Sequence, residues 1–164
     1  HVFETIREAG RALDLKMVGL HAMDSLRIEK AFRHFGHDIT CEDHVVDAGL
    51  GFAVKTAKND FIGREAVLKR KEDGPKLRML QFRLTDPEPL LFHHEPIVRD
   101  GNVVGYLTSG NYGHTLGAAV GLGYVPAEFA KETDGWEIEV AGRRIAAEAS
   151  LRPMYDPKSE RVKV

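Results

Sequence analysis

The pattern of the sequence changes at the turn cluster Asp73-Gly74-Pro75. Gly and Pro in succession interrupt regular structure, so this cluster separates two kinds of segment. Before it, apolar residues recur with the period of a helix. After it, short runs alternate between apolar and polar residues, as half-buried strands do. We therefore predict an α+β chain in which a mostly helical part, residues 1–74, precedes a small antiparallel β-barrel or sandwich of residues 75–164.

Six short segments of the second part favour strands: residues 78–84, 96–99, 103–108, 121–125, 136–140 and 143–149. The second and third flank Asp100-Gly101-Asn102, whose residues tolerate the positive φ angles of a tight turn, which predicts a hairpin there. The glycines between Gly105 and Gly123 do not have the G-x-G-x-x-G spacing of a phosphate loop. We expect them to allow close backbone packing in the barrel.

Three helices and one buried extended stretch are expected in the first part: helices over residues 2–13, 24–36 and 63–72, and the stretch over residues 50–54. In the second helix, Asp24 or Ser25 is the candidate N-cap, Glu29 supports the cap and Gly36 ends the helix. Its predicted apolar face contains Leu26, Ile28, Ala31, Phe32 and Phe35.

The first expected helix carries an apolar face at the very start of the chain, made of Val2, Phe3, Ile6, Ala9 and Leu13. The sequence begins at His1 and enters this helix directly. We expect a truncated chain whose partner elements lie upstream, with this face exposed in their absence.

Composition argues against several classes of protein. A net charge of −2 leaves no basic surface for nucleic acid. No apolar run approaches the about 18 residues of a membrane-spanning helix, so no membrane partner is expected. The single Cys41 excludes an internal disulfide, which favours the cytoplasm, or the mitochondrial matrix in a eukaryote.

A zinc site is a possible interpretation of His34, His37, Cys41 and His44, whose spacing places three imidazoles and a thiol close together in sequence. We do not expect a metal, because the Gly-His-Asp at 36–38 has another explanation in the resemblance described next. Cys41 has no basic partner placed by the sequence, so it is a weak candidate nucleophile.

Several blocks of sequence, in order, resemble the C-terminal part of the glycine-cleavage T-protein family of folate-dependent aminomethyltransferases. The blocks are GLHAMDSLRIEKAFRHFGHD (19–38), DAGLGFAV (47–54), DFIGREA (60–66), EPIVRDG (95–101), TSGNYGHTL (108–116) and GLGYVP (121–126). The Tyr-Gly-His run at 112–114 is most similar to the branch fused to flavin-dependent dimethylglycine and sarcosine dehydrogenases.

The resemblance implies a protein of three domains arranged in a ring around the folate. Residues 1–74 would be the end of the second domain, and residues 75–164 the whole third domain, a jelly-roll-like barrel. The family's catalytic aspartate would lie upstream of His1, so no catalytic residue is assigned and the piece alone should be inactive. The implied cofactors are tetrahydrofolate, bound together with the upstream domains of the same polypeptide, and FAD in the full-length parent only.

The implied function is the C-terminal segment of an enzyme that passes a methylene group from an oxidised N-methyl amine to tetrahydrofolate. A glycine-cleavage aminomethyltransferase and a non-catalytic folate-binding or interaction module are the alternatives. Arg27 is a candidate contact of the anionic folate tail, or else a salt-bridged helix residue; Tyr112 and His114, on an expected Gly-rich loop, either line the site or pack a turn. Two positions depart from the family, Met23 in place of an arginine and Ala118 in place of a basic residue.

Overall fold

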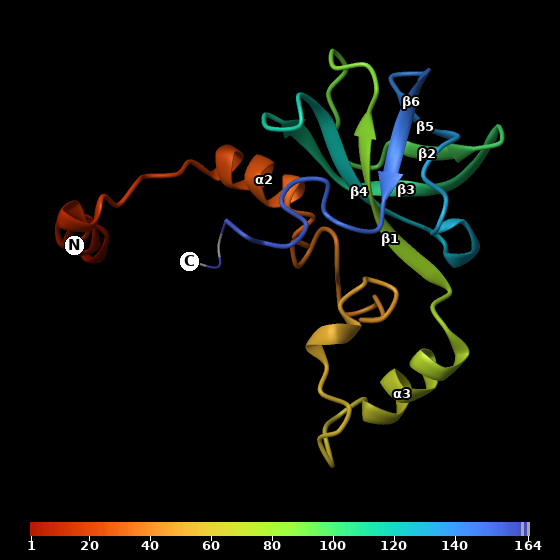
Figure 1. Cartoon of the computed structure of the whole chain (residues 1–164), viewed down its shortest axis with the longest axis horizontal. Helices are drawn as coiled ribbons and strands as arrows, with labels where there is room; N and C mark the ends of the chain where they lie inside the picture. The colour runs from red at the N-terminus through yellow and green to blue at the C-terminus, as the bar shows by residue number, and fades with distance from the viewer. Residues whose placement is uncertain (162, 164) are drawn as a thin grey trace.

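A closed six-stranded antiparallel barrel forms the C-terminal half of the chain, as the alternation of the sequence predicts (Figure 1). The computed structural model describes residues 1–161 and 163. The strands are β1 (Leu77–Leu84), β2 (Pro96–Arg99), β3 (Asn102–Gly113), β4 (Ala118–Pro126), β5 (Trp136–Val140) and β6 (Arg143–Ser150). They follow one another around the barrel in the order β1-β4-β3-β2-β5-β6, with β6 pairing again with β1. A short 3-10 helix, η3 (Ala127–Phe129), follows β4.

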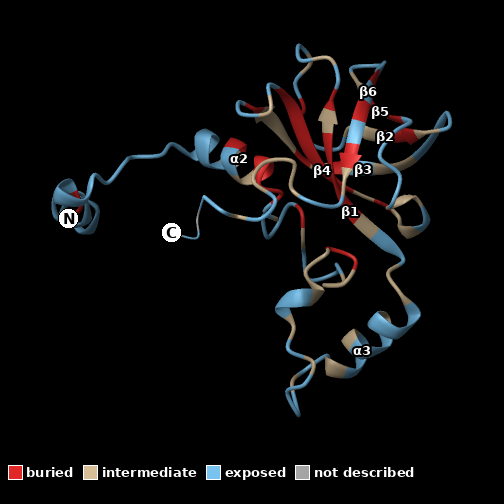
Figure 2. Cartoon of the chain, in the orientation of Figure 1, coloured by how far each residue is buried: buried red, intermediate tan, exposed pale blue. Residues whose placement is uncertain are grey.

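The core fills the barrel with alternate side chains of these strands (Figure 2). Trp136 and Phe82 meet edge to face with ring centroids 5.5 Å apart, and both are almost fully buried. Leu80, Ile97 and Ile138 complete the centre of this core. Burial of such side chains is the main force that closes the sheet on itself.

The predicted hairpin between β2 and β3 is confirmed, because Arg99 pairs with Asn102 across a two-residue turn. Asp100 and Gly101 both have positive φ, 50° and 78°, as a type I′ turn requires. The third strand is longer than expected and continues from residue 108 to Gly113. The backbones approach so closely that a Cβ at Gly105 would lie 2.0 Å from the Tyr124 carbonyl oxygen, which explains the glycines as packing positions.

Helix α2 (Leu20–Glu29) starts and ends earlier than the sequence predicts. Gly19 is its N-cap, so Asp24 and Ser25 lie inside the helix, and Ser25 donates a hydrogen bond of 2.6 Å to the Tyr112 carbonyl on β3. Glu29 does not support the helix start, because its buried carboxylate accepts the backbone N–H of Thr115 at 2.6 Å. These long-range partners are invisible in a local capping pattern.

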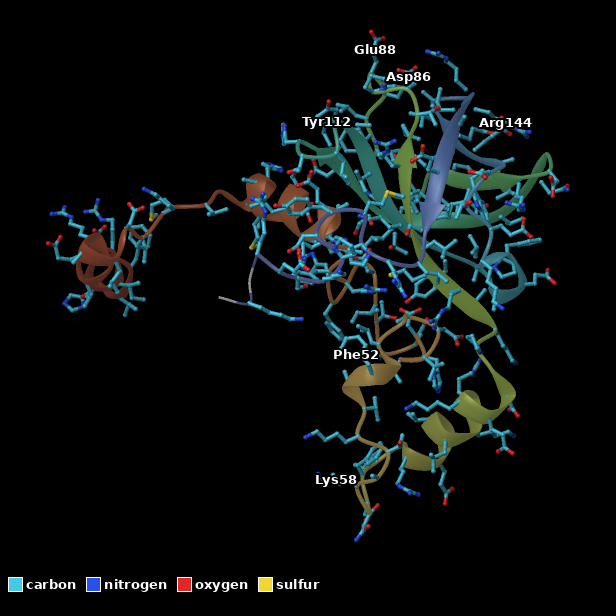
Figure 3. The ribbon with its side chains drawn as sticks, viewed as in Figure 1. Phe52, Lys58, Asp86, Glu88, Tyr112 and Arg144 are labelled. Carbon is cyan, nitrogen blue, oxygen red and sulfur yellow. The ribbon has the colours of Figure 1, made fainter. Side chains whose placement is uncertain are left out.

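After α2 the chain reverses at Ala31, whose φ of 51° is left-handed, so residues 32–36 are not helical. Phe32 and Phe35 are consequently 55% and 66% exposed, and their predicted place on a buried helix face is wrong. The expected extended stretch at 50–54 is also wrong, since it contains a 3-10 helix, η2 (Gly51–Ala53), and Phe52 is 85% exposed (Figure 3).

The other two predicted helices are confirmed. Helix α1 (Val2–Gly10) continues as a 3-10 helix, η1 (Arg11–Leu13), and α3 (Arg64–Asp73) ends just before the predicted turn cluster. Val2, Phe3 and Ile6 of α1 are exposed, and α1 lies apart from the barrel (Figure 2). Among the described residues, no helix is long and apolar enough to span a membrane.

Two connections hold α2 against the barrel. The buried Gln81 of β1 donates to the carbonyl oxygens of Ile28 and Glu29 and accepts the Met154 N–H at 2.7 Å. Lys30 forms a 3.0 Å ion pair with Asp156 in the C-terminal segment. The end of the chain therefore closes over α2 and fixes this helix beside β3 and β4.

Candidate functional site

A cleft of about 590 Å³ lies where α2 meets the barrel. Four segments form its walls: α2, the turn that follows α2, the connection between β1 and β2, and β3. Tyr112 of β3 lies at the edge of the barrel beside this cleft (Figure 3). The lining is Leu20, His21, Met23, Asp24, Arg27, Phe32, Arg33, His34, His37, Leu90, Leu91, Phe92, His93, Thr108, Ser109, Gly110, Asn111 and Tyr112.

Large apolar side chains that are at least half exposed gather in this cleft. Five of its lining residues are of this kind: Leu20, Met23, Phe32, Leu90 and Phe92. A concave, mostly apolar surface with a few polar groups is typical of a site for a small molecule. The cleft is therefore the candidate functional site.

Arg27 lies at the base of the cleft and is bound on several sides by its own chain. Its Nε donates to Asp24 at 2.6 Å, its Nη1 to Asp38 at 2.5 Å, and its Nη2 to Ser109 at 2.9 Å. Nη1 also reaches the Phe32 carbonyl at 3.3 Å. Arg27 is thus the salt-bridged helix residue that the sequence allowed for, and its contact with a substrate stays a prediction.

Asp38 is the acidic centre of this network and has no exposed surface. Besides Arg27, its carboxylate accepts the His34 N–H at 2.8 Å and the Thr108 hydroxyl at 2.5 Å. The Tyr124 hydroxyl donates to the Asp38 carbonyl at 3.0 Å. A buried carboxylate that is fully paired in this way fixes the turn after α2 to the face of β3 and β4.

Two neighbouring groups are perturbed by burial. Burial raises the pKa of the Tyr124 phenol, with the carboxylates of Asp43 and Asp38 adding to the effect. Burial also lowers the pKa of Arg33, which donates to the carbonyls of Ala48 at 3.1 Å and Ala31 at 2.6 Å. Both groups stay in their usual forms near neutral pH.

The two other predicted site residues differ in position. Tyr112 lines the cleft, although it belongs to strand β3 and not to a loop. His114 lies on the turn after β3 and contacts the Tyr112 ring edge-on, with centroids 5.2 Å apart, outside the lining. Their roles toward a substrate stay predictions.

Three residues that organise the cleft were not among the predicted site residues: Asp38, Thr108 and Ser109. All three stand inside sequence blocks that were recognised, but no local pattern links residue 38 to residue 108. The zinc alternative gains no support, because among the described residues no three His, Cys, Asp or Glu side chains gather at one point. Cys41 is exposed.

Gly110 allows the connection between β1 and β2, which forms one wall of the cleft, to pack against β3. Leu91 of this connection is almost fully buried, and a Cβ at Gly110 would lie 2.6 Å from the Leu91 carbonyl carbon and 2.7 Å from the Phe92 nitrogen. Only a residue without a side chain lets this backbone lie against β3.

Gly110→Ala should therefore lower the free energy of unfolding by about 1–3 kcal/mol, because backbone must move to admit the methyl group. Urea unfolding measures this change, and hydrogen exchange of residues 85–95 should rise with it. Gly51→Ala is the matched control, since its Cβ would meet no atom closer than 3.7 Å. Equal stability of the two variants would contradict the assigned contact.

Comparison with known families decides what this architecture belongs to. Residues 77–156 match the model described as the glycine cleavage T-protein C-terminal barrel domain, and residues 1–58 match the GCVT N-terminal domain. The chain belongs to the glycine cleavage T-protein family. The resemblance to this family and the predicted barrel are thereby confirmed.

Several relatives of this T-protein-family chain are known. It is 43% identical over 164 residues to a 4-methylaminobutanoate oxidase (formaldehyde-forming) of Paenarthrobacter nicotinovorans, covering 99% of this chain and 20% of that protein. It is 37% identical over 142 residues to an aminomethyltransferase of Exiguobacterium sibiricum, covering 87% of this chain and 39% of the relative. The crystal structure of glycine cleavage system aminomethyltransferase T from Bartonella henselae superposes with a TM-score of 0.78 at 29% identity, covering 87% of this chain and 40% of that one. The chain thus spans between a fifth and two fifths of these relatives.

Proposed function

We propose that the chain is the C-terminal region of a longer, tetrahydrofolate-dependent one-carbon transfer enzyme of the demethylating oxidase type. The observation that carries this proposal is the 43% identity to a formaldehyde-forming methylamino acid oxidase, which extends over 99% of the chain. Residues 1–74 would complete a folate-binding domain, and residues 75–164 would form the terminal barrel. Upstream domains of the same polypeptide would be the principal partners.

The cleft fits one wall of a folate site. Phe32, Phe92 and Tyr112 offer aromatic surface to a flat ring, and polar groups at the rim suit the carboxylates of a folate tail. Met23 replaces the cation expected from the family, so the tail would depend on other side chains of the cleft. FAD would be held elsewhere in the polypeptide, because this sequence has no G-x-G-x-x-G fingerprint.

The proposed chemistry joins two steps. In the complete enzyme a bound flavin would accept the hydride, with its two electrons, that the methyl carbon of an N-methyl amine loses. The two nitrogens of tetrahydrofolate would then take up the methylene carbon, the bond from this carbon to the amine nitrogen would break, and the two N–H protons of the folate would pass to the departing amine. The described residues would orient the folate and exclude water from the carbon, which would otherwise be released as formaldehyde.

Turnover by the complete polypeptide tests this function. The substrate is 4-methylaminobutanoate, sarcosine or dimethylglycine. When tetrahydrofolate is added, the enzyme should release methylenetetrahydrofolate in place of an equal amount of free formaldehyde. A formaldehyde scavenger is the control, because carbon passed within the enzyme is protected from it.

If the amount of formaldehyde released is the same with and without tetrahydrofolate, the proposal is contradicted. Ammonia release from an aminomethylated lipoyl carrier, without oxidation of any N-methyl amine, would replace it with the aminomethyltransferase activity named for the relative from Exiguobacterium sibiricum.

A further inference from the structure

Arg27, the predicted contact of an anionic ligand, is already hydrogen-bonded to residues of its own chain. Its Nε and both of its Nη atoms donate to groups of its own chain, and only 14% of its side chain is exposed. A ligand carboxylate that displaced these bonds would leave Asp38 buried without its counter-ion, which is strongly unfavourable. An anion in the cleft therefore needs a different receptor.

Four histidines stand at the rim of the same cleft, and they come from three of its walls. His21 belongs to α2, His34 and His37 to the turn after α2, and His93 to the connection between β1 and β2. All four are exposed. Within the described part of the chain, none of their ring nitrogens has a hydrogen-bond partner, so all are available to a ligand.

The fixed charges around these histidines cancel. Two carboxylates, Asp24 and Asp38, balance two guanidiniums, Arg27 and Arg33. The one titratable group that β3 contributes to the lining is the phenol of Tyr112. The acidic residues on the connection that carries His93 do not line the cleft: Asp86 and Glu88 lie at its far tip (Figure 3), and Glu95 accepts the Phe92 N–H. The charge of the cleft is thus set by its imidazoles.

His34 and His37 are the pair that the fold holds in place. Their ring centroids are 4.7 Å apart. The His34 carbonyl accepts the N–H of His37 at 3.2 Å and of Asp38 at 2.8 Å, and the His34 N–H donates to the Asp38 carboxylate. The backbone that carries the two rings is therefore fixed by its hydrogen bonds within the buried Asp38 network.

We propose that His34 and His37 together bind the carboxylate end of an aromatic ligand in this cleft, and that binding takes up protons, so that it strengthens as pH falls from about 8 to about 6. This inference rests on the proposed folate function and names the residues that receive the tail. Two imidazolium groups this close repel each other, and a carboxylate that accepts a hydrogen bond from each of them offsets the repulsion. A protonated histidine also donates from both nitrogens, which gives short, charge-assisted hydrogen bonds.

Calorimetry on the complete polypeptide with 4-aminobenzoylglutamate tests the inference. Affinity should be about tenfold higher at about pH 6 than at about pH 8, with proton uptake seen in buffers of different ionisation enthalpy. The diamide of the same probe has the ring without the charges, and its binding should be weaker and independent of pH.

Three variants sharpen the test. His34→Gln combined with His37→Gln should abolish the pH dependence, and His37→Arg should bind at about pH 8 as tightly as the unchanged chain does at about pH 6. His44→Gln is the control, because His44 lies outside the cleft lining and should leave the profile unchanged. Thermal melting of each variant confirms that it is folded.

The inference is overturned if the unchanged chain binds the probe equally at both pH values, or not at all, or if the double variant keeps the pH dependence. These results are separable from the proposed function. If the enzyme transfers the carbon to tetrahydrofolate but the affinity for the probe does not change with pH, only the assignment of His34 and His37 as the receptor is refuted. If the affinity for the probe changes with pH as expected but no carbon is transferred, only the proposed reaction is refuted.

Discussion

Asp38→Ala should lower the free energy of unfolding by about 3–5 kcal/mol, because it removes one partner of a buried ion pair. Arg27 would keep its charge in a site where only 14% of its side chain reaches solvent. The His34 N–H would lose its acceptor as well, and the Thr108 hydroxyl would keep only the Leu122 carbonyl at 3.1 Å. The total free energy of unfolding of a small domain is about 5–15 kcal/mol, so such a loss would be a large part of it.

Urea unfolding followed by circular dichroism measures this effect, and Asp24→Ala is its matched control. Asp24 bonds the same guanidinium but its side chain is 36% exposed, so its removal should cost no more than about 1 kcal/mol. Equal losses in the two variants would mean that burial of Asp38 contributes nothing, against the network described above.

Trp136→Ala should lower the free energy of unfolding by about 3–5 kcal/mol, the usual effect of emptying a large aromatic site in a core. Trp136 is 1% exposed and meets Phe82 inside the barrel, with Phe129 at a centroid distance of 6.3 Å. Its Nε1 donates to the Glu132 carbonyl at 3.0 Å, and the Arg99 guanidinium lies 4.7 Å from its ring centroid.

Phe35→Ala is the contrasting variant, since Phe35 is 66% exposed and its loss should change stability by less than about 0.5 kcal/mol. Circular dichroism is the measurement for both variants, because Trp136 is the only tryptophan and its fluorescence disappears with it. A small loss at Trp136 with a large one at Phe35 would instead support the longer amphipathic helix that the sequence suggested.

Much of the barrel could be predicted because its signals are local. The alternation in β1 and the Asp100-Gly101 turn each depend on a few adjacent residues, and β2 and β5 match the expected bounds. Strand β3 was expected to end at residue 108 because Gly-rich sequence is typical of a loop, whereas Gly110 and Gly113 allow neighbouring segments to lie against the strand.

The second helix and the site could not be predicted as fully, because tertiary contacts decide them. Ser25 resembles a cap in sequence but bonds a strand 87 positions away. The reversal at Ala31 turns residues 32–38 toward β3, which brings the imidazoles of His34 and His37 to the cleft. Arg27 and Tyr112 line the cleft, and their contact with a substrate stays a prediction. No local pattern links Asp38 to Arg27, so their ion pair could not be predicted.

Titration of tetrahydrofolate into the complete polypeptide tests most directly the claim that this cleft forms one wall of a folate site. One equivalent should bind, and replacing both Phe32 and Phe92 with alanine should weaken binding by about tenfold or more, because the aromatic surface for the ring is lost. The melting temperature should hardly change, since both side chains are more than half exposed. Tetrahydrofolate binding that is unaffected by the double substitution, or no binding at all, would contradict the account.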